Sequence, residues 1–185
     1  MESRTWPYVI FCYTVSSPRS VRNHMDRGSE NKPVVLAESA EDMRSLGERL
    51  GQALRIGDVV ALSGPLGSGK TTFVQGLARG LGVPPDRHVA SPSFALVNEH
   101  PGRRPFVHVD FYRIRSFAEL PELGLEEAFD FSVTAIEWAE RFPEALPEDH
   151  LHITVVAEDS GRRHLHLHGT GPRGRAMAAE LDPRP

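Results

Sequence analysis

A glycine-rich loop directly follows an unbroken apolar run in residues 59–72, which read VVALSGPLGSGKTT. The loop matches the pattern G-x-x-x-x-G-K-[ST], with Gly64 at its start and Lys70-Thr71 at its end. Apolar residues at helical spacing follow in residues 73–81. A buried strand, a glycine loop and a helix in this order predict a phosphate-binding loop.

The residue types of the loop suit a nucleoside triphosphate. Glycines let successive backbone N–H groups point at phosphate oxygens, and the start of the following helix adds its positive end. Lys70 supplies a positive charge, and Thr71 offers a hydroxyl to Mg²⁺. Lys70 is also one of only two lysines among the 21 basic residues, the other being Lys32. We therefore expect the nucleotide to contact Gly67, Ser68, Gly69, Lys70, Thr71 and Thr72.

Two acidic residues end apolar stretches that we predict to be strands. Asp110 closes FVHVD, residues 106–110, and Glu137 closes VTAIE, residues 133–137. In open α/β sheets ligands bind at the carboxyl ends of the strands, so both acids are expected beside the loop. Either acid can serve a Mg²⁺ ion, and Glu137 can alternatively orient the attacking water, which makes Lys70, Asp110 and Glu137 the candidate catalytic residues. The competing interpretation is that each acid caps the turn after its strand.

The motif SPSF, residues 91–94, lies between the predicted loop helix and Asp110. P-loop proteins often keep a segment there that senses the γ-phosphate, so the hydroxyls of Ser91 and Ser93 are candidate switch groups. An ordinary Ser-Pro turn leading into a strand explains the motif nearly as well.

Histidines occur on two of the predicted strands. His108 shares the side of its strand with Asp110, and we expect it either to hydrogen-bond that carboxylate or a water, or to be a satisfied core residue. His164, His166 and His168 lie on one strand face with leucines opposite. That alternation indicates a solvated face over a buried one more simply than a metal site.

Working outward from the loop, the chain alternates predicted strands and helices. A strand at residues 34–36 and a helix capped by Ser39, with Asp42 three residues on, precede the loop. The elements expected after it are a hairpin of residues 93–100 and 106–110, a broken helical stretch at 119–129, a strand at 133–137, and a hairpin of 151–157 and 164–168 whose tip carries Arg162-Arg163. We predict an α/β fold: a single P-loop NTPase domain with a mixed, mainly parallel central sheet flanked by helices.

The length of 185 residues suits one domain. We expect residues 1–33 to be a flexible extension outside it, residues 34–170 to be the P-loop ATPase domain, and residues 171–185 to be a tail with a short helix at 176–181. The apolar run near the N-terminus is too short to span a bilayer and lacks a basic flank and a good cleavage site. With a single cysteine as well, the sequence favours a cytoplasmic protein with no membrane partner.

The charge balance argues against a dedicated nucleic-acid binder. The chain has 21 Lys and Arg against 25 Asp and Glu, a formal net charge of −4, and a pI of about 6.1. Such a chain has no overall field that attracts an anionic polymer. Any contact with RNA is therefore expected to be indirect or weak.

Five short motifs occur in a fixed order: GPLGSGKTTF at 64–73, SPSF at 91–94, HVDFYR at 108–113, ELGLEE at 122–127 and IEWAER at 136–141. In this order they resemble the bacterial TsaE family, small ATPases required for tRNA threonylcarbamoyladenosine biosynthesis. The resemblance covers roughly residues 34–170. It is specific because five motifs recur together, whereas a P-loop alone is shared by many families.

The resemblance implies Mg²⁺-dependent ATP hydrolysis coupled to the TsaB and TsaD subunits, which transfer a threonylcarbamoyl group to an adenosine in tRNA. It also implies that Thr71 and Glu137 are metal ligands, that Asp110 is a metal-linked acid, and that Ser39 lies near the nucleotide. Two alternatives stay open. One is a small-molecule P-loop kinase, for which residues 113–115 offer an arginine-bearing lid, and the other is a nucleotide-gated adaptor with little turnover.

Overall fold

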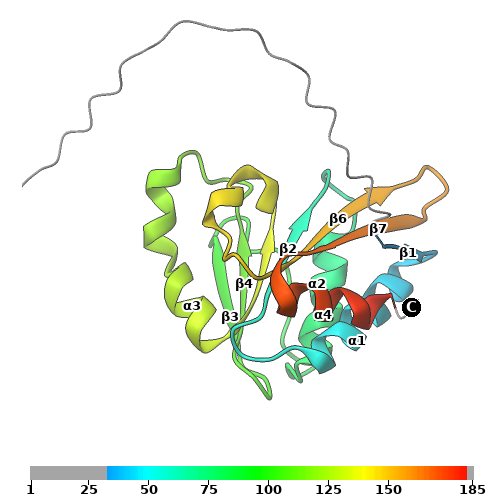
Figure 1. Ribbon diagram of the computed structural model, residues 1–185, viewed down its shortest axis with the longest axis horizontal. Coiled ribbons are helices and arrows are strands. Elements are labelled where there is room, and N and C mark those ends of the chain that lie inside the picture. The colour runs from blue at the N-terminus through cyan, green and yellow to red at the C-terminus, as the bar shows by residue number, and fades with distance from the viewer. Residues whose placement is uncertain (1–32, 183–185) are drawn as a thin grey trace, which may run out of the picture. The chain divides into compact units, whose positions relative to one another are not determined.

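The computed structural model describes residues 33–182 (Figure 1). In this part of the chain seven strands form one sheet, in the order β1-β7-β6-β2-β5-β4-β3. The strands are β1 (Val34–Ala37), β2 (Val59–Ser63), β3 (Val97–His100), β4 (Phe106–Asp110), β5 (Val133–Glu137), β6 (Leu151–Ala157) and β7 (Arg163–Gly169). The α-helices are α1 (Ala40–Ala53), α2 (Lys70–Gly80), α3 (Leu125–Phe131) and α4 (Gly171–Leu181), with 3-10 helices η1 (Phe117–Leu123), η2 (Ala139–Arg141) and η3 (Pro143–Ala145). The predicted extension at 1–33 lies, apart from Pro33, outside the described residues.

Parallel pairing is confined to the centre of the sheet. β2 pairs in parallel with β5 and with β6, and β5 pairs in parallel with β4. The β1–β7, β6–β7 and β3–β4 pairs at the two edges are antiparallel. All residues of β2, β4 and β5 are buried, as expected for parallel strands covered on both faces. The predicted mixed α/β sheet flanked by helices is confirmed.

Helices cover both faces of this sheet (Figure 1). Side chains of β2 alternate between the two layers, because successive residues of a strand point to opposite faces. Val60 and Leu62 join the core formed with α1, α2 and α4. Val59 and Ala61 join the core formed with η1, α3 and η2. The glycine loop leaves the end of β2 between these layers.

Two pairs of glycines bring α1 and α2 into close contact. A Cβ on Gly47 of α1 would stand 2.3 Å from the backbone O of Phe73, and one on Gly76 of α2 would stand 2.1 Å from the backbone O of Arg44. Gly51 and Gly80, four residues further along each helix, meet the opposite backbone in the same way. Only glycine permits this approach, which fixes α2, and therefore the loop before it, against α1.

Besides one-residue extensions at the ends of β1 and β7, three predicted elements differ from the structure in their bounds. β3 begins only at Val97, because Leu96 adopts a left-handed conformation with φ 67° and ends the preceding turn. The helical stretch predicted at 119–129 is η1 and α3, which are separated by Gly124 at φ 65°. The C-terminal helix begins at Gly171 and packs against β7, β6 and α1. None of the described helices has the length and apolar character that crossing a membrane requires.

Candidate nucleotide and metal site

The phosphate loop runs from the end of β2 to the start of α2. Gly64, Gly67 and Gly69 all have positive φ values, of 138°, 77° and 106°, which side-chain-bearing residues rarely adopt. A Cβ on Gly64 would also stand 2.4 Å from the backbone O of Val155 in β6. Gly69 is the N-cap of α2 and offers no side chain to cap it. The first N–H groups of α2 are therefore free to bind an anion.

The Lys70 side chain is folded back into this loop. Its Nζ donates to the backbone O of Gly64 at 2.7 Å and of Pro65 at 3.0 Å, and lies 4.0 Å from the centre of the Trp138 ring. Burial lowers the pKa of Lys70, against the attraction of Glu137, Glu140 and Asp110. Lys70 is thus a buried cation held by neutral carbonyl oxygens, which are weaker partners than a phosphate.

Thr71 and Glu137 are in direct contact. The Thr71 hydroxyl donates to Glu137 Oε1 at 2.8 Å and lies 3.1 Å from Oε2. His108 Nε2 lies 2.9 Å from the same Oε1, and both His108 and Glu137 are buried. A carboxylate can only accept, so the imidazole N–H donates. Of the alternatives considered for His108, the bond to the Asp110 carboxylate is wrong and the buried core position is confirmed: the neighbouring parallel strand brings Glu137 to its ring.

Asp110 stands beside Glu137, because the two residues are paired in the β4–β5 register. Its Oδ2 accepts from the Ser91 hydroxyl and its Oδ1 from the backbone N–H of Tyr112 at 2.7 Å. The second contact is the turn cap that the competing interpretation expects. The first ties the SPSF motif to the carboxylate, so Asp110 is both a cap and a side chain of the site.

A cavity of about 370 Å³ joins these groups. The predicted residues that line it are Gly67, Gly69, Lys70, Thr71, Thr72, Ser91, Ser93, Asp110 and Glu137. Leu66, Tyr112, Arg113 and Trp138 complete the wall. Backbone donors and a cation on one side thus face two carboxylates on the other, as a phosphate and an accompanying cation require.

A family model described as "Threonylcarbamoyl adenosine biosynthesis protein TsaE" matches residues 37–165, most of the described chain. The chain belongs to the TsaE family. The membership confirms the resemblance expected from the five motifs, and it places the chain in tRNA threonylcarbamoyladenosine biosynthesis.

Relatives in this family match over most of their length. The tRNA threonylcarbamoyladenosine biosynthesis protein TsaE of Streptomyces coelicolor is 42% identical over 139 residues, which cover 71% of this chain and 93% of the relative. The protein of the same name in Bacillus subtilis is 35% identical, covering 76% and 88%. The crystal structure of Bacillus subtilis YdiB matches with a TM-score of 0.70 at 30% identity, over 82% of this chain and 95% of that chain. The P-loop fold is thus shared with a solved structure.

Two predicted nucleotide-binding residues of this TsaE-family chain do not line the cavity. The Ser39 side chain caps α1 by accepting from the backbone N–H of Asp42 at 3.0 Å, as the sequence predicts. The Ser68 side chain is buried under the loop, and its Oγ has no hydrogen-bond partner among the described residues. Their contact with a nucleotide stays a prediction.

Two further residues of the site were not predicted from the sequence. Trp138 adopts a left-handed conformation, with φ 59°, that brings its ring under Lys70. Arg163, predicted only to lie at a hairpin tip, turns back toward the loop, and its Nε lies 3.8 Å from where a Cβ on Gly69 would stand. A bulky residue directly after the strand-end Glu137 was the available signal for Trp138. Nothing local distinguishes Arg163 from Arg162.

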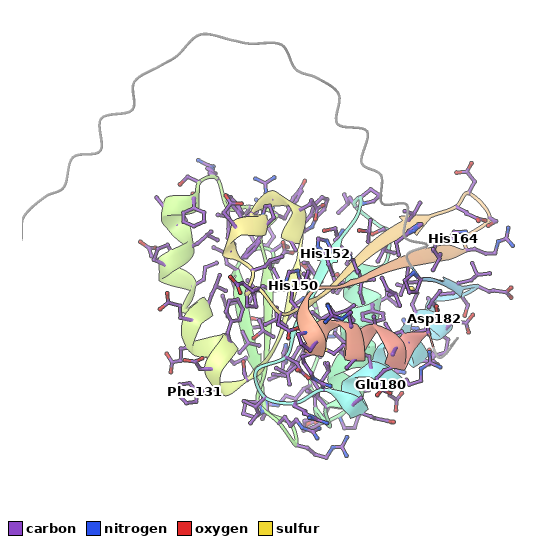
Figure 2. All side chains as sticks on the ribbon, in the orientation of Figure 1. Phe131, His150, His152, His164, Glu180 and Asp182 are labelled. Atoms are coloured by element: carbon purple, nitrogen blue, oxygen red, sulfur yellow. The ribbon has the colours of Figure 1, made fainter. Side chains whose placement is uncertain are left out.

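The three histidines of β7 do not form a metal site. His164 is paired with Glu158 near the outer end of the β6–β7 hairpin (Figure 2). In residues 33–182 no group of three His, Cys, Asp or Glu side chains is arranged to hold a metal ion. The leucines between these histidines are buried, so the alternation separates a buried face from a more exposed one.

Proposed function

We propose that the chain binds ATP with Mg²⁺ in this cavity and hydrolyses it, in support of threonylcarbamoyl transfer to tRNA adenosine by TsaB and TsaD in the cytoplasm. The observation that carries the proposal is the contact of Thr71, at the head of α2, with Glu137, at the end of the adjacent strand β5. A hydroxyl and a carboxylate meeting beside a phosphate loop are the protein groups that a nucleotide-bound Mg²⁺ uses.

The loop residues bind the phosphates in this account. Backbone N–H groups at the start of α2 bind phosphate oxygens, and Lys70 exchanges its two carbonyl partners for phosphate oxygens. The exchange is favourable because an ammonium group attracts an ionised phosphate oxygen more strongly than a neutral carbonyl oxygen. Arg163 adds a second cation on the β7 side of Gly69.

The donor set fits Mg²⁺. Thr71, Glu137 and Asp110 offer only oxygen atoms, which Mg²⁺ prefers, and a site with few protein ligands suits an ion that also binds phosphates and water. When bound, Mg²⁺ neutralises phosphate charge and polarises the transferred phosphoryl group. Thr71 and Glu137 are the proposed ligands, because they already touch each other.

With Thr71 and Glu137 as the proposed ligands, Asp110 orients the attacking water or a water bound to the metal. It lies next to Glu137 in register and already accepts from the hydroxyl of Ser91. Ser91 and Ser93 both line the cavity, so a γ-phosphate there would meet the SPSF motif. The motif is thus placed to couple the presence of that phosphate to the surface of the protein.

A partner protein completes the site in this proposal. Leu66 of the loop, which lines the cavity, and Phe94, which follows the cavity-lining Ser93, are 79% and 84% exposed, although both are large apolar side chains. The Arg113 guanidinium lies 4.1 Å above the Phe94 ring. Exposed apolar residues around a site mark an interaction surface. TsaB and TsaD are the partners that the family resemblance implies.

The test separates binding from turnover with two variants. Lys70→Ala removes the loop cation and is expected to weaken ATP binding by about 1.5 to 3 kcal/mol, measured by titration calorimetry.

Glu137→Gln keeps the shape of the side chain but loses its charge, so hydrolysis should fall by roughly a hundredfold or more while ATP without Mg²⁺ still binds. Near-normal hydrolysis by Glu137→Gln would show that Glu137 only caps the turn after its strand. If only Lys70→Ala impairs tRNA modification, the chain is a nucleotide-gated adaptor.

A further inference from the structure

A second cavity, of about 510 Å³, lies between η1, α3 and η3, away from the phosphate loop. Its floor includes Leu120 and Leu125, which belong to the buried core of this face. Phe117 forms one wall and is 52% exposed. In the described part of the chain nothing covers this apolar surface. We call this cavity and its rim the acidic groove.

Carboxylates surround the acidic groove. Three of the residues that line the groove are acidic, and none of the lining residues is basic. These three, Glu126, Glu127 and Glu144, stand exposed at the rim, and none of them forms an ion pair within residues 33–182. The guanidinium of the nearby Arg141 donates to the backbone O of Ile114 at 2.8 Å. The rim therefore keeps its negative charge.

Part of this acidity has a local explanation. Glu119 belongs to a capping box with Ser116 and accepts from its backbone N–H at 2.9 Å. Glu126 and Glu127 lie in the first turn of α3, where acidic residues are favourable. Neither effect accounts for Glu144 on the separate element η3, or for a half-exposed phenylalanine between the carboxylates.

The combination selects one kind of occupant. Covering the exposed ring of Phe117 is favourable because it removes apolar surface from water, and a rim of unpaired carboxylates is stabilised when cations approach. RNA and acidic proteins are repelled by the same rim. Figure 1 shows α3 on the opposite side of the sheet from α1 and α4. Phe131, at the end of α3, also projects outward and is 67% exposed (Figure 2).

We propose that the acidic groove docks a basic amphipathic segment of a partner protein, one that turns Leu- or Phe-like side chains to the floor and Lys or Arg to the rim. Two of the three elements that form the groove, η1 and α3, lie on the connection between β4 and β5, which begins directly after Asp110 and ends directly before β5. A partner bound here contacts the segment that joins β4 and β5, the two strands that carry Asp110 and Glu137.

The test uses the full chain without nucleotide, so its failure is separable from a failure of the proposed ATPase. Three fluorescent peptides of about 18 residues, five helical turns, are compared by anisotropy. The first has a leucine stripe and a lysine face, the second replaces every lysine by glutamate, and the third replaces every leucine by serine. Only the first should bind, and raising the salt from about 50 to about 500 mM should weaken it.

Matched variants localise the binding. Phe117→Ser and Glu144→Lys alter the groove at exposed positions, so the fold should tolerate both. Each should weaken binding of the first peptide, Phe117→Ser by about tenfold or more because the covered aromatic surface is lost. Ile56→Ser and Glu180→Lys make the same chemical changes at exposed positions elsewhere and should leave the affinity within about twofold.

Three results would overturn the proposal. The first is equal binding of the first peptide by groove and control variants. The second is direct binding of tRNA by the wild-type chain that Phe117→Ser weakens and Ile56→Ser does not, which would make the groove a nucleic-acid site. The third is concentration-dependent self-association that Phe117→Ser abolishes and Ile56→Ser does not, which would make the occupant a second copy.

Discussion

Glu137 is the residue on which the contacts of the site converge. Its carboxylate accepts from Thr71 and His108, and its backbone O accepts from the N–H of Phe111 at 3.0 Å. One residue thus links the phosphate loop, the adjacent strand and the turn after Asp110.

His108 is expected to orient Glu137. His108→Leu removes the N–H that faces Oε1 and leaves a carboxylate lone pair without its donor, whereas His108→Gln keeps a donating N–H. The Leu variant should therefore need more Mg²⁺, by about tenfold if one charged hydrogen bond of roughly 1.5 to 3 kcal/mol is lost, and the Gln variant should recover part of that loss. The measurement is the Mg²⁺ midpoint of nucleotide binding, with calorimetric melting as a control for stability. Unchanged midpoints in both variants would assign His108 to the core alone.

Lys70 predicts a pH dependence of ATP binding. Only the protonated ammonium attracts phosphate, and burial lowers its pKa. The affinity should be full below that lowered pKa and decline as the pH rises through it, at a lower pH than the value of about 10.4 of an ordinary lysine. Lys70→Arg should bind without this decline, because guanidinium stays charged. The ATP affinity can be measured by titration calorimetry across the alkaline range. Equal pH profiles for the wild-type protein and Lys70→Arg would refute the role of Lys70.

At the residue scale, the sequence predicted those side chains of the site that lie within short motifs. Lys70 and Thr71 follow from the loop pattern, and Asp110 and Glu137 from acids that close apolar strands. The partner of His108 was predicted wrongly, and Arg163 was missed, because both depend on which strands become neighbours. That information is not carried by residues close in the sequence.

The contact between α1 and α2 is the element-scale feature on which the loop depends. Gly47 and Gly51 of α1 face Gly76 and Gly80 of α2, with the two backbones too close for any side chain. Glycine within a helix costs up to about 1 kcal/mol relative to alanine, so four of them here need a compensating contact. The close packing behind the start of α2 is that compensation.

Gly76→Ala should therefore destabilise the protein. Its Cβ would stand 2.1 Å from the backbone O of Arg44, and overpacking costs about 1 to 3 kcal/mol, more than the roughly 1 kcal/mol gained in helix propensity. We expect a net loss in the free energy of unfolding by urea, and weaker ATP binding because α2 shifts with the loop. Gln52→Ala, on an exposed position of α1, is the control and should stay within about 0.5 kcal/mol. Wild-type stability in Gly76→Ala would show that the helices separate at little cost.

Elements with a clear pattern were predicted closely. The strands at 59–63, 106–110, 133–137 and 151–157 have the predicted bounds, because each is an apolar run ended by a change in residue type. The start of β3 was misplaced, since a left-handed leucine at position 96 has no sequence signature.

At the scale of the whole molecule, strand order creates the site. β2 lies between β5 and β6, so the loop after β2 opens beside the ends of β5 and β4. The α/β class could be predicted from the alternation of strands and helices. The order of the strands could not, because fully buried strands are apolar throughout and carry no pattern that identifies their neighbours.

The most direct test of the account is steady-state phosphate release at fixed ATP and Mg²⁺, with TsaB and TsaD added singly and together. Leu66, which lines the cavity, and Phe94, next to the cavity-lining Ser93, are exposed apolar side chains that the described chain does not cover. We expect slow release by the chain alone and acceleration when both subunits are present, since partner-completed P-loop sites gain up to about 10³- to 10⁵-fold. Phosphate release by Glu137→Gln should stay slow in every mixture. Rapid release by the chain alone that neither subunit changes would contradict a partner-completed ATPase.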